Sequence, residues 1–125
     1  MNKKNYRDLE IYKMAYKLAL DVHKLSLKLP KYELYEEGSQ IRRSSKSITI
    51  NIDEGYGRRR FRNDFIKFLI YAHSSCDETK VHLNFIYDTG HISEESYNKY
   101  HEKYDKLGQM IYNFITRIES EHRTY

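Results

Sequence analysis

The stretch Gln40–Phe68 reads QIRRSSKSITINIDEGYGRRRFRNDFIKF and joins two predicted helices. It contains the run Ile48–Ile52, whose β-branched residues favour a strand when they are considered locally. We interpret this run as helix, because burial of isoleucines inside a helix bundle outweighs a weak local preference. The predicted helix begins at Ser39 or Gln40 and ends at Tyr56.

Four residues near the end of this helix are predicted to form a structural turn, namely Asn51, Glu54, Gly55 and Gly57. The two glycines are expected to supply the left-handed or open backbone geometry that ends the helix. Glu54 is expected to pair with an arginine and to order the turn, since a carboxylate near a core needs a basic partner. No second acid, nucleophile or metal ligand stands at a spacing that would make Glu54 a general base.

Positive charge is concentrated in the same stretch. The chain has a net charge of +4, and eight basic residues face only three acidic ones between Arg42 and Lys67, so this stretch carries the whole excess. Arginine forks suit phosphate oxygens, and such a cluster is typical of a nucleic-acid surface. Tyr56 and Phe61 could stack on unpaired bases, although we interpret both as core residues at helix ends. The predicted nucleic-acid-binding residues are Arg42, Arg43, Lys46, Arg58, Arg59, Arg60, Arg62 and Lys67.

Outside this stretch, apolar residues recur every three or four positions, which is the period of helices that pack on one another. One helix is predicted over residues 8–29, capped by Asp8 and ended by Pro30. Another is predicted from Asn63 as N-cap to Gly90 as the residue after its end, and a last one over residues 93–119, capped by Ser93. The three apolar seams are Ile11, Ala15, Leu18, Val22, Leu25 and Leu29; Phe65, Leu69, Ala72, Cys76, Thr79, Leu83 and Ile86; and Tyr97, Tyr100, Tyr104, Leu107, Ile111, Phe114 and Ile118.

Four long helices with short connections predict an all-α fold, an antiparallel up-down-up-down four-helix bundle in which residues 1–125 form a single domain. A single Pro and 5 Gly leave too few turn residues for an all-β fold. One Cys excludes an internal disulfide framework and indicates a reducing, cytoplasmic setting. No signal peptide is recognisable, and no apolar run approaches the roughly 20 residues of a membrane span. Aromatic residues outside the seams indicate a homo-oligomer.

The segments Gln40–Ile48 (QIRRSSKSI) and Asn51–Arg58 (NIDEGYGR) carry a resemblance to a known family. Together with Tyr6–Lys13 and the pairs Asp64-Phe65, Phe68-Leu69 and Asp77-Glu78, they resemble the bacterial four-helix-bundle proteins encoded by intervening sequences of 23S rRNA genes. The accessory protein of diversity-generating retroelements is a related bundle. Where this family often has a small residue or proline before the asparagine, this chain has Thr49 and Ile50.

The resemblance implies a homopentameric ring of bundles with a basic face. It also implies a role in binding structured RNA or nucleoprotein without catalysis or cofactors, with a protein partner such as a reverse transcriptase. We therefore predict a non-enzymatic, oligomeric bundle that binds RNA through the basic corner between the second and third long helices. The alternative is a protein-interaction scaffold, in which the same arginines form ion pairs between subunits.

Metal or thiol chemistry has little support in the sequence. Glu119-x-x-His122 matches half of a di-iron bundle motif, but such a site needs that motif twice and two further inward glutamates. Glu78 and His82 lie one helical turn apart, as surface ion pairs do. Cys76 falls on an apolar seam, so we interpret it as a small buried residue rather than a nucleophile.

Overall fold

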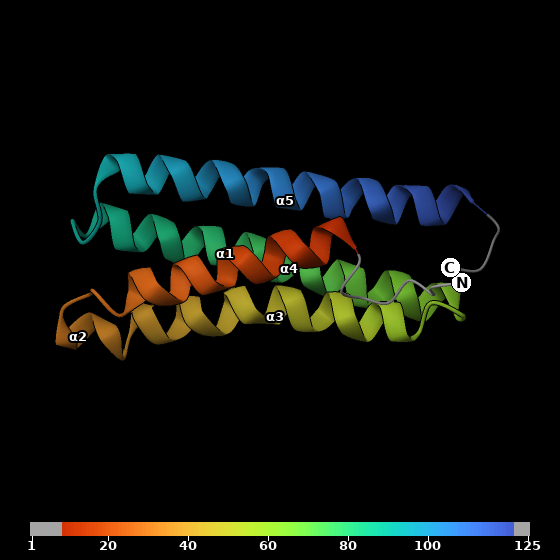
Figure 1. Cartoon of the computed structure of the whole chain (residues 1–125), viewed down its shortest axis with the longest axis horizontal. Coiled ribbons are helices and arrows are strands. Elements are labelled where there is room, and N and C mark those ends of the chain that lie inside the picture. Colours follow the sequence, from red (N-terminus) through yellow and green to blue (C-terminus); the bar gives the residue numbers. More distant parts are fainter. Residues whose placement is uncertain (1–8, 122–125) are drawn as a thin grey trace.

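The structure is a computed structural model, and it describes residues 9–121. These residues form no strand and five helices: α1 (Glu10–Ser26), α2 (Lys31–Leu34), α3 (Glu37–Gly57), α4 (Arg62–Asp88) and α5 (Glu94–Ser120). Figure 1 shows the four long helices side by side, with the short α2 at one end. Contacts join α1 to α3, α3 to α4, α4 to α5 and α5 to α1, so the four helices surround one core. The predicted all-α four-helix bundle is confirmed, with the short α2 as an additional helix.

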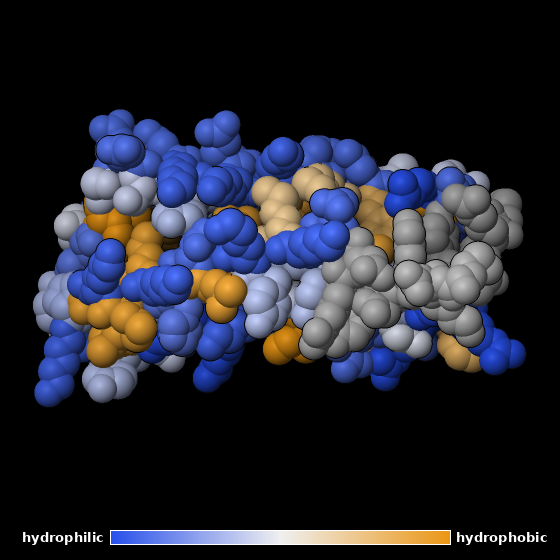
Figure 2. Space-filling view, in the orientation of Figure 1, coloured by the Kyte–Doolittle hydropathy of each residue, from blue (hydrophilic) through white to orange (hydrophobic). Residues whose placement is uncertain are grey.

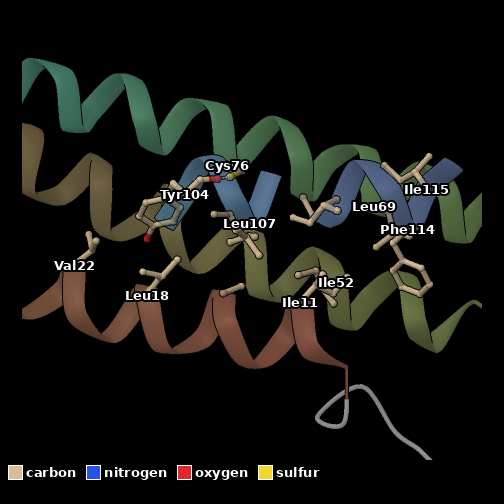
Figure 3. Close-up of a cluster of buried hydrophobic side chains, with 14 of the residues drawn as sticks. Ile11, Leu18, Val22, Ile52, Leu69, Cys76, Tyr104, Leu107, Phe114 and Ile115 are labelled. Atoms are coloured by element: carbon tan, nitrogen blue, oxygen red, sulfur yellow. Dashed lines mark hydrogen bonds between the residues drawn. The ribbon is translucent and has the colours of Figure 1, made fainter. Parts of the chain in front are cut away.

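The predicted apolar seams form this core. All seven predicted positions of α4 are buried, and every predicted position of the first helix except the half-buried Leu25 is buried. On α5 the seam is buried from Tyr104 onward, whereas Tyr97 and Tyr100 are half-buried. Figure 3 shows apolar side chains of all four long helices meeting in one cluster. Burial of this shared surface is the main favourable contribution to folding.

The run Ile48–Ile52 lies inside α3, as predicted. Ile48 and Ile52 are fully buried, whereas Ile50 is 58% exposed. A strand would place all three side chains on one face, so this pattern is helical. Small side chains beside the run let α3 approach α4: the hydroxyl of Thr79 donates to that of Ser44 at 2.9 Å, and a similar bond of 2.9 Å joins Ser47 to Ser75.

Three helix boundaries differ from the prediction. The first helix ends at Ser26, and the amides of Lys28 and Leu29 then bond to carbonyls three residues back, a tighter winding that leads to Pro30. The next long helix begins at Glu37, ahead of the predicted Ser39 or Gln40, and includes a buried glycine. The N-cap of α4 is Phe61 rather than Asn63, because the carbonyl of Phe61 already accepts the amide of Phe65 in the first hydrogen bond of the helix. The predicted cap Asp8 lies outside the described residues.

The connection from α4 to α5 agrees with the prediction. Gly90 has a φ of 82°, the left-handed geometry that glycine adopts without strain after a helix. Ser93 then caps α5, because its hydroxyl oxygen accepts the amide of Ser96 at 3.1 Å.

Gly55 and Gly57 do not end α3 through left-handed geometry, which corrects the prediction. Among residues 9–121, Gly90 is the one residue with a positive φ. Gly55 lies buried in the last turn of α3, where an added Cβ would come within 3.1 Å of the Phe68 Cβ and 3.2 Å of the Phe65 carbonyl oxygen. An added Cβ at Gly57 would meet nothing within 4 Å. Gly55 is therefore a close-packing residue that lets α3 and α4 approach each other.

Cys76 lies in the core, where its thiol donates to the carbonyl of Tyr104 at 3.3 Å. Burial raises the pKa of the Cys76 thiol to about 12. Burial also raises the pKa of the Tyr104 hydroxyl, which points toward α1 in Figure 3. The predicted burial of Cys76 is confirmed, and since the thiolate is the reactive form of cysteine, we expect its thiol to be unreactive in the folded chain.

We expect an aromatic disulfide reagent to label Cys76 at pH 8 only as fast as the protein unfolds. We also expect the free energy of unfolding to fall as the pH rises above about 9, because the thiol ionises near its ordinary pKa of 9.0 in the unfolded chain but near 12 in the folded one. Labelling followed by absorbance, with and without urea, checks the first result, and urea titrations at several pH values check the second. Rapid labelling of the native protein would contradict this account.

Candidate nucleic-acid interface

The connection between α3 and α4 brings five basic side chains to one end of the bundle. The turn Arg58–Phe61 is closed by a hydrogen bond of 2.8 Å from the amide of Phe61 to the carbonyl of Arg58. Lys67 follows in the second turn of α4. We call Arg58, Arg59, Arg60, Arg62 and Lys67 the basic corner. All but Arg59, which is half-buried, are exposed.

Two arginines of the basic corner are held by α3 itself. Arg58 donates to the Glu54 carboxylate at 2.6 Å, and its guanidinium lies 4.7 Å from the centre of the Phe68 ring. Arg59 donates to the carbonyl of Tyr56 at 2.9 Å and stacks over the ring of the same residue. Glu54 thus has an arginine partner at the turn. An exposed ion pair of this kind contributes little to stability, but it fixes the direction of the side chain.

Arg62 links the start of α4 to the end of α5. Its guanidinium donates to the carbonyl of Ile118 at 3.3 Å and also to that of Glu119. These carbonyls belong to the last turn of a helix, where no further amide of the helix reaches them. Arg62 therefore holds the start of α4 against the end of α5, which is a structural role rather than the predicted phosphate contact.

Arg60 and Lys67 are the members of the basic corner without a carboxylate or carbonyl partner among the described residues, and each lies near an aromatic ring, with the Lys67 ammonium 5.4 Å from the centre of the Phe68 ring. Both are exposed, and neither forms an ion pair or hydrogen bond within residues 9–121. The ring of Phe61 is 60% exposed and lies 5.8 Å from the Arg60 guanidinium. Tyr56 is only 8% exposed. The interpretation as a core residue is thus right for Tyr56 and wrong for Phe61, which stands on the outside of the turn.

Arg42, Arg43 and Lys46 do not join the basic corner, contrary to the prediction of one continuous site. Sixteen residues of α3 separate Arg42 from Arg58, which is about 24 Å at ~1.5 Å per residue. Arg42 is half-buried and donates to the Ser26 hydroxyl at 2.9 Å and to the Leu34 carbonyl at 3.0 Å. It ties the end of α1 and the short α2 to α3.

Asn51 is also absent from the turn. Its amide donates to the carbonyl of Ser47 at 2.9 Å and to the hydroxyl of that residue at 3.0 Å, within the middle of α3. Because Ser47 also bonds to Ser75, Asn51 supports the contact between α3 and α4 rather than the geometry of the helix end.

A second basic surface was not predicted from the sequence. It lies in the seam between α1 and α5 and is lined by Lys17, Lys24, Lys28, Lys103 and Lys106. Lys17 and Lys24 are seven residues apart, which places them on one face of α1 and could have been recognised; Lys28 follows just after the end of this helix. The pairing with α5 could not, because these lysines are distant in sequence and α1 and α5 become neighbours only through the fold.

The described residues offer neither a metal site nor a membrane-spanning helix. Residues 9–121 contain no group of three or more His, Cys, Asp or Glu side chains that could hold a metal ion. His82 instead lies between the carboxylates of Glu37 at 2.8 Å and Glu78 at 3.2 Å. His122 lies outside the described residues. No helix in the described part of the chain is long and apolar enough to cross a bilayer.

Comparison with known proteins gives a structural and a family-level match. One solved structure, of a protein with unknown function from the S23 ribosomal protein family of Bacteroides thetaiotaomicron, has a TM-score of 0.78 to this chain and 23% sequence identity. The match covers 85% of this chain and 95% of that chain, and at this identity it supports the shared fold alone. No match was found among curated proteins. The model of the family described as 23S rRNA-intervening sequence protein matches residues 7–113, and the chain therefore belongs to this family.

Proposed function

We propose that this protein is a non-enzymatic homo-oligomer that binds structured RNA through the basic corner. The observation that carries the proposal is the exposed Phe61 ring beside Arg60, whose guanidinium has no ion pair or hydrogen bond within residues 9–121, with Lys67 on the same corner. Arginine and lysine suit phosphates, and an exposed ring suits the unpaired bases of loops and bulges. The family description names a ribosomal RNA, which supports RNA as the polyanion.

The partners of the other arginines favour this proposal over the alternative scaffold. Arg42, Arg58 and Arg62 each bind oxygen atoms of their own chain. They have no need of acidic residues from a neighbouring subunit. If the alternative held, binding of RNA would be absent and charge changes at the basic corner would alter only the assembly.

We expect the double variant Arg60→Gln/Lys67→Gln to bind a labelled RNA hairpin about tenfold more weakly at 0.1 M salt. The slope of log affinity against log salt should fall by about 1.8, since each phosphate contact to a duplex contributes about 0.9. Fluorescence anisotropy over a salt series measures both quantities. The matched control is Lys13→Gln/Lys31→Gln, which removes the same charge from two exposed lysines elsewhere. Equal losses in both variants, or no binding by the wild type at low salt, would refute the proposal.

Two separate apolar surfaces support the oligomeric part of the proposal. The first is a groove of about 470 Å³ between α1 and α3, where Tyr16, Leu20 and Ile50 are about half exposed. The second is the outer face of α4, where Ile70, Val81 and Phe85 are about half exposed, with Ser74 and Asp77 between Ile70 and Val81. Exposed apolar patches of this kind are typical of protein contacts. Because the two surfaces are different, a head-to-tail arrangement would pair them, and such an arrangement closes into a ring when the rotation between successive subunits is a whole fraction of a turn. The homopentamer implied by the family resemblance is such a ring.

We expect light scattering to give a mass well above that of one 15.2 kDa chain at micromolar concentration. Ile50→Glu should shift the protein toward monomer, because a charge would then have to be buried in the contact. Gln40→Glu, which adds the same charge at an exposed polar position of α3, should leave the mass unchanged. A monomeric wild-type protein would remove the oligomer from the proposal while leaving the RNA site to its own test.

A further inference from the structure

The seam between α1 and α5 forms a groove at a distance from the basic corner. It consists of two cavities of about 360 Å³ and about 220 Å³ that share Asp21 in their walls. We call Lys17, Lys24, Lys28, Lys103 and Lys106 the lysine groove. Figure 2 looks onto this side of the molecule: hydrophilic side chains cover α1 and α5, and apolar groups show in the seam between them.

The charge of the lysine groove is largely uncompensated. Asp21 is the one acidic residue among those that line the two cavities, and it pairs with Lys17 at 3.6 Å. Lys24, Lys28, Lys103 and Lys106 form no ion pair within residues 9–121. Like charges held close together in a groove repel one another and create a positive potential that attracts an anion with several charges.

The arrangement of the groove fits a single nucleic-acid strand. Lysines of α1 and α5 face each other across the seam; Lys17 and Lys24 lie about 10 Å apart along α1 at ~1.5 Å per residue, and Lys28 follows just beyond the end of the helix. The half-buried ring of Tyr100 lines the larger cavity, with Lys99 and Lys103 5.3 and 6.0 Å from its centre. A charged groove that includes an aromatic ring is the usual design of sites for single strands, whose unpaired bases can stack.

We propose that the lysine groove binds the phosphate backbone of a single-stranded nucleic acid, with Tyr100 stacking on one of its bases. This site is separate from the basic corner. The corner contacts α5 at Ile118 and Glu119, fifteen residues beyond Lys103, which is about 22 Å along the helix. An acidic peptide would meet the same lysines but would have no base to place on Tyr100, so the ring favours nucleic acid.

The test uses the full chain and an oligouridine of about 12 nucleotides with a fluorescein label, a length within the usual range for such sites. We expect Lys24→Gln/Lys106→Gln to weaken binding about tenfold at 0.1 M salt and to lower the salt slope by about 1.4, because each contact to a single strand contributes about 0.7. Tyr100→Leu should weaken binding about fivefold or more without changing the slope, since it removes stacking and no charge. The control Lys31→Gln/Arg43→Gln removes two exposed charges that do not line the groove, and it should bind within about twofold of the wild type.

The basic-corner variant Arg60→Gln/Lys67→Gln separates this inference from the proposed function. It should leave oligouridine binding nearly unchanged while weakening the hairpin, and the groove variant should do the reverse. Four results would overturn the groove as a single-strand site: an unaffected groove variant, an equal loss in the control Lys31→Gln/Arg43→Gln, binding of oligouridine that depends on the corner alone, or a polyglutamate peptide that binds as tightly as oligouridine. None of them would affect the hairpin result, which tests the corner.

Discussion

Replacing Gly55 by valine is expected to lower the free energy of unfolding by about 3 kcal/mol, the upper end of what overpacking a core usually costs. The reason is the close approach of α3 and α4 at their junction. A Cβ at this position would lie 3.1 Å from the Phe68 Cβ and 3.2 Å from the Phe65 carbonyl oxygen. The oxygen belongs to the backbone of α4, and Phe65 is fully buried against the edges of Tyr56 and Phe114. Room for the valine side chain therefore requires α4 to shift away from α3, which would displace the buried Phe65 ring.

Gly57→Val is the matched control, since it lies two residues away and faces open space. We expect it to change the free energy of unfolding by less than about 0.5 kcal/mol, as surface substitutions usually do. Urea denaturation of both variants at one protein concentration measures the difference, with the concentration fixed because assembly would shift the midpoint. If both variants lost the same stability, the glycines would act by ending the helix, as the sequence pattern suggests, rather than by close packing.

Arg42→Met is the second variant with a large expected effect, a loss of about 3 kcal/mol. Two hydrogen bonds from a charged donor are removed, each worth about 1.5–3 kcal/mol, and part of this is offset because Arg42 is only half-buried. The Leu34 carbonyl loses the donor that holds α2 against α3, and the Ser26 hydroxyl loses its link to α3. Methionine keeps most of the apolar stem, so the change reports mainly on these hydrogen bonds.

The neighbouring Arg43 provides the comparison, because it is exposed on the outer side of α3. Arg43→Met should change stability by less than about 0.5 kcal/mol. Urea denaturation again measures stability, and hairpin anisotropy of the folded variants measures RNA binding. If the Arg42→Met variant kept its stability but bound RNA more weakly, the structural role of Arg42 would be refuted and a phosphate contact would be supported.

The contrast between Arg42 and Arg60 shows the limit of charge patterns in a sequence. Both belong to the same basic stretch, and composition alone cannot separate an arginine that binds a carbonyl of its own chain from one that is left for a ligand. The difference arises because α3 is long and straight, so residues near its start lie far from those at its end. The exposure of Phe61 differs from the prediction for a related reason. The turn between α3 and α4 places its ring outside the bundle, whereas Tyr56, five residues earlier, packs inside.

The sequence by itself determined the four long helices and their buried faces, because a three-four apolar period is a local property of such helices, whereas the short α2 was not predicted. It also located the left-handed Gly90 and the cap at Ser93, whose geometry depends on a few neighbouring residues. Only the tertiary structure decided which glycine lets two helices touch, which arginines the chain engages itself, and which lysines of α1 and α5 face each other. Those features depend on distances between residues far apart in the chain, and packing fixes these distances where local preference cannot.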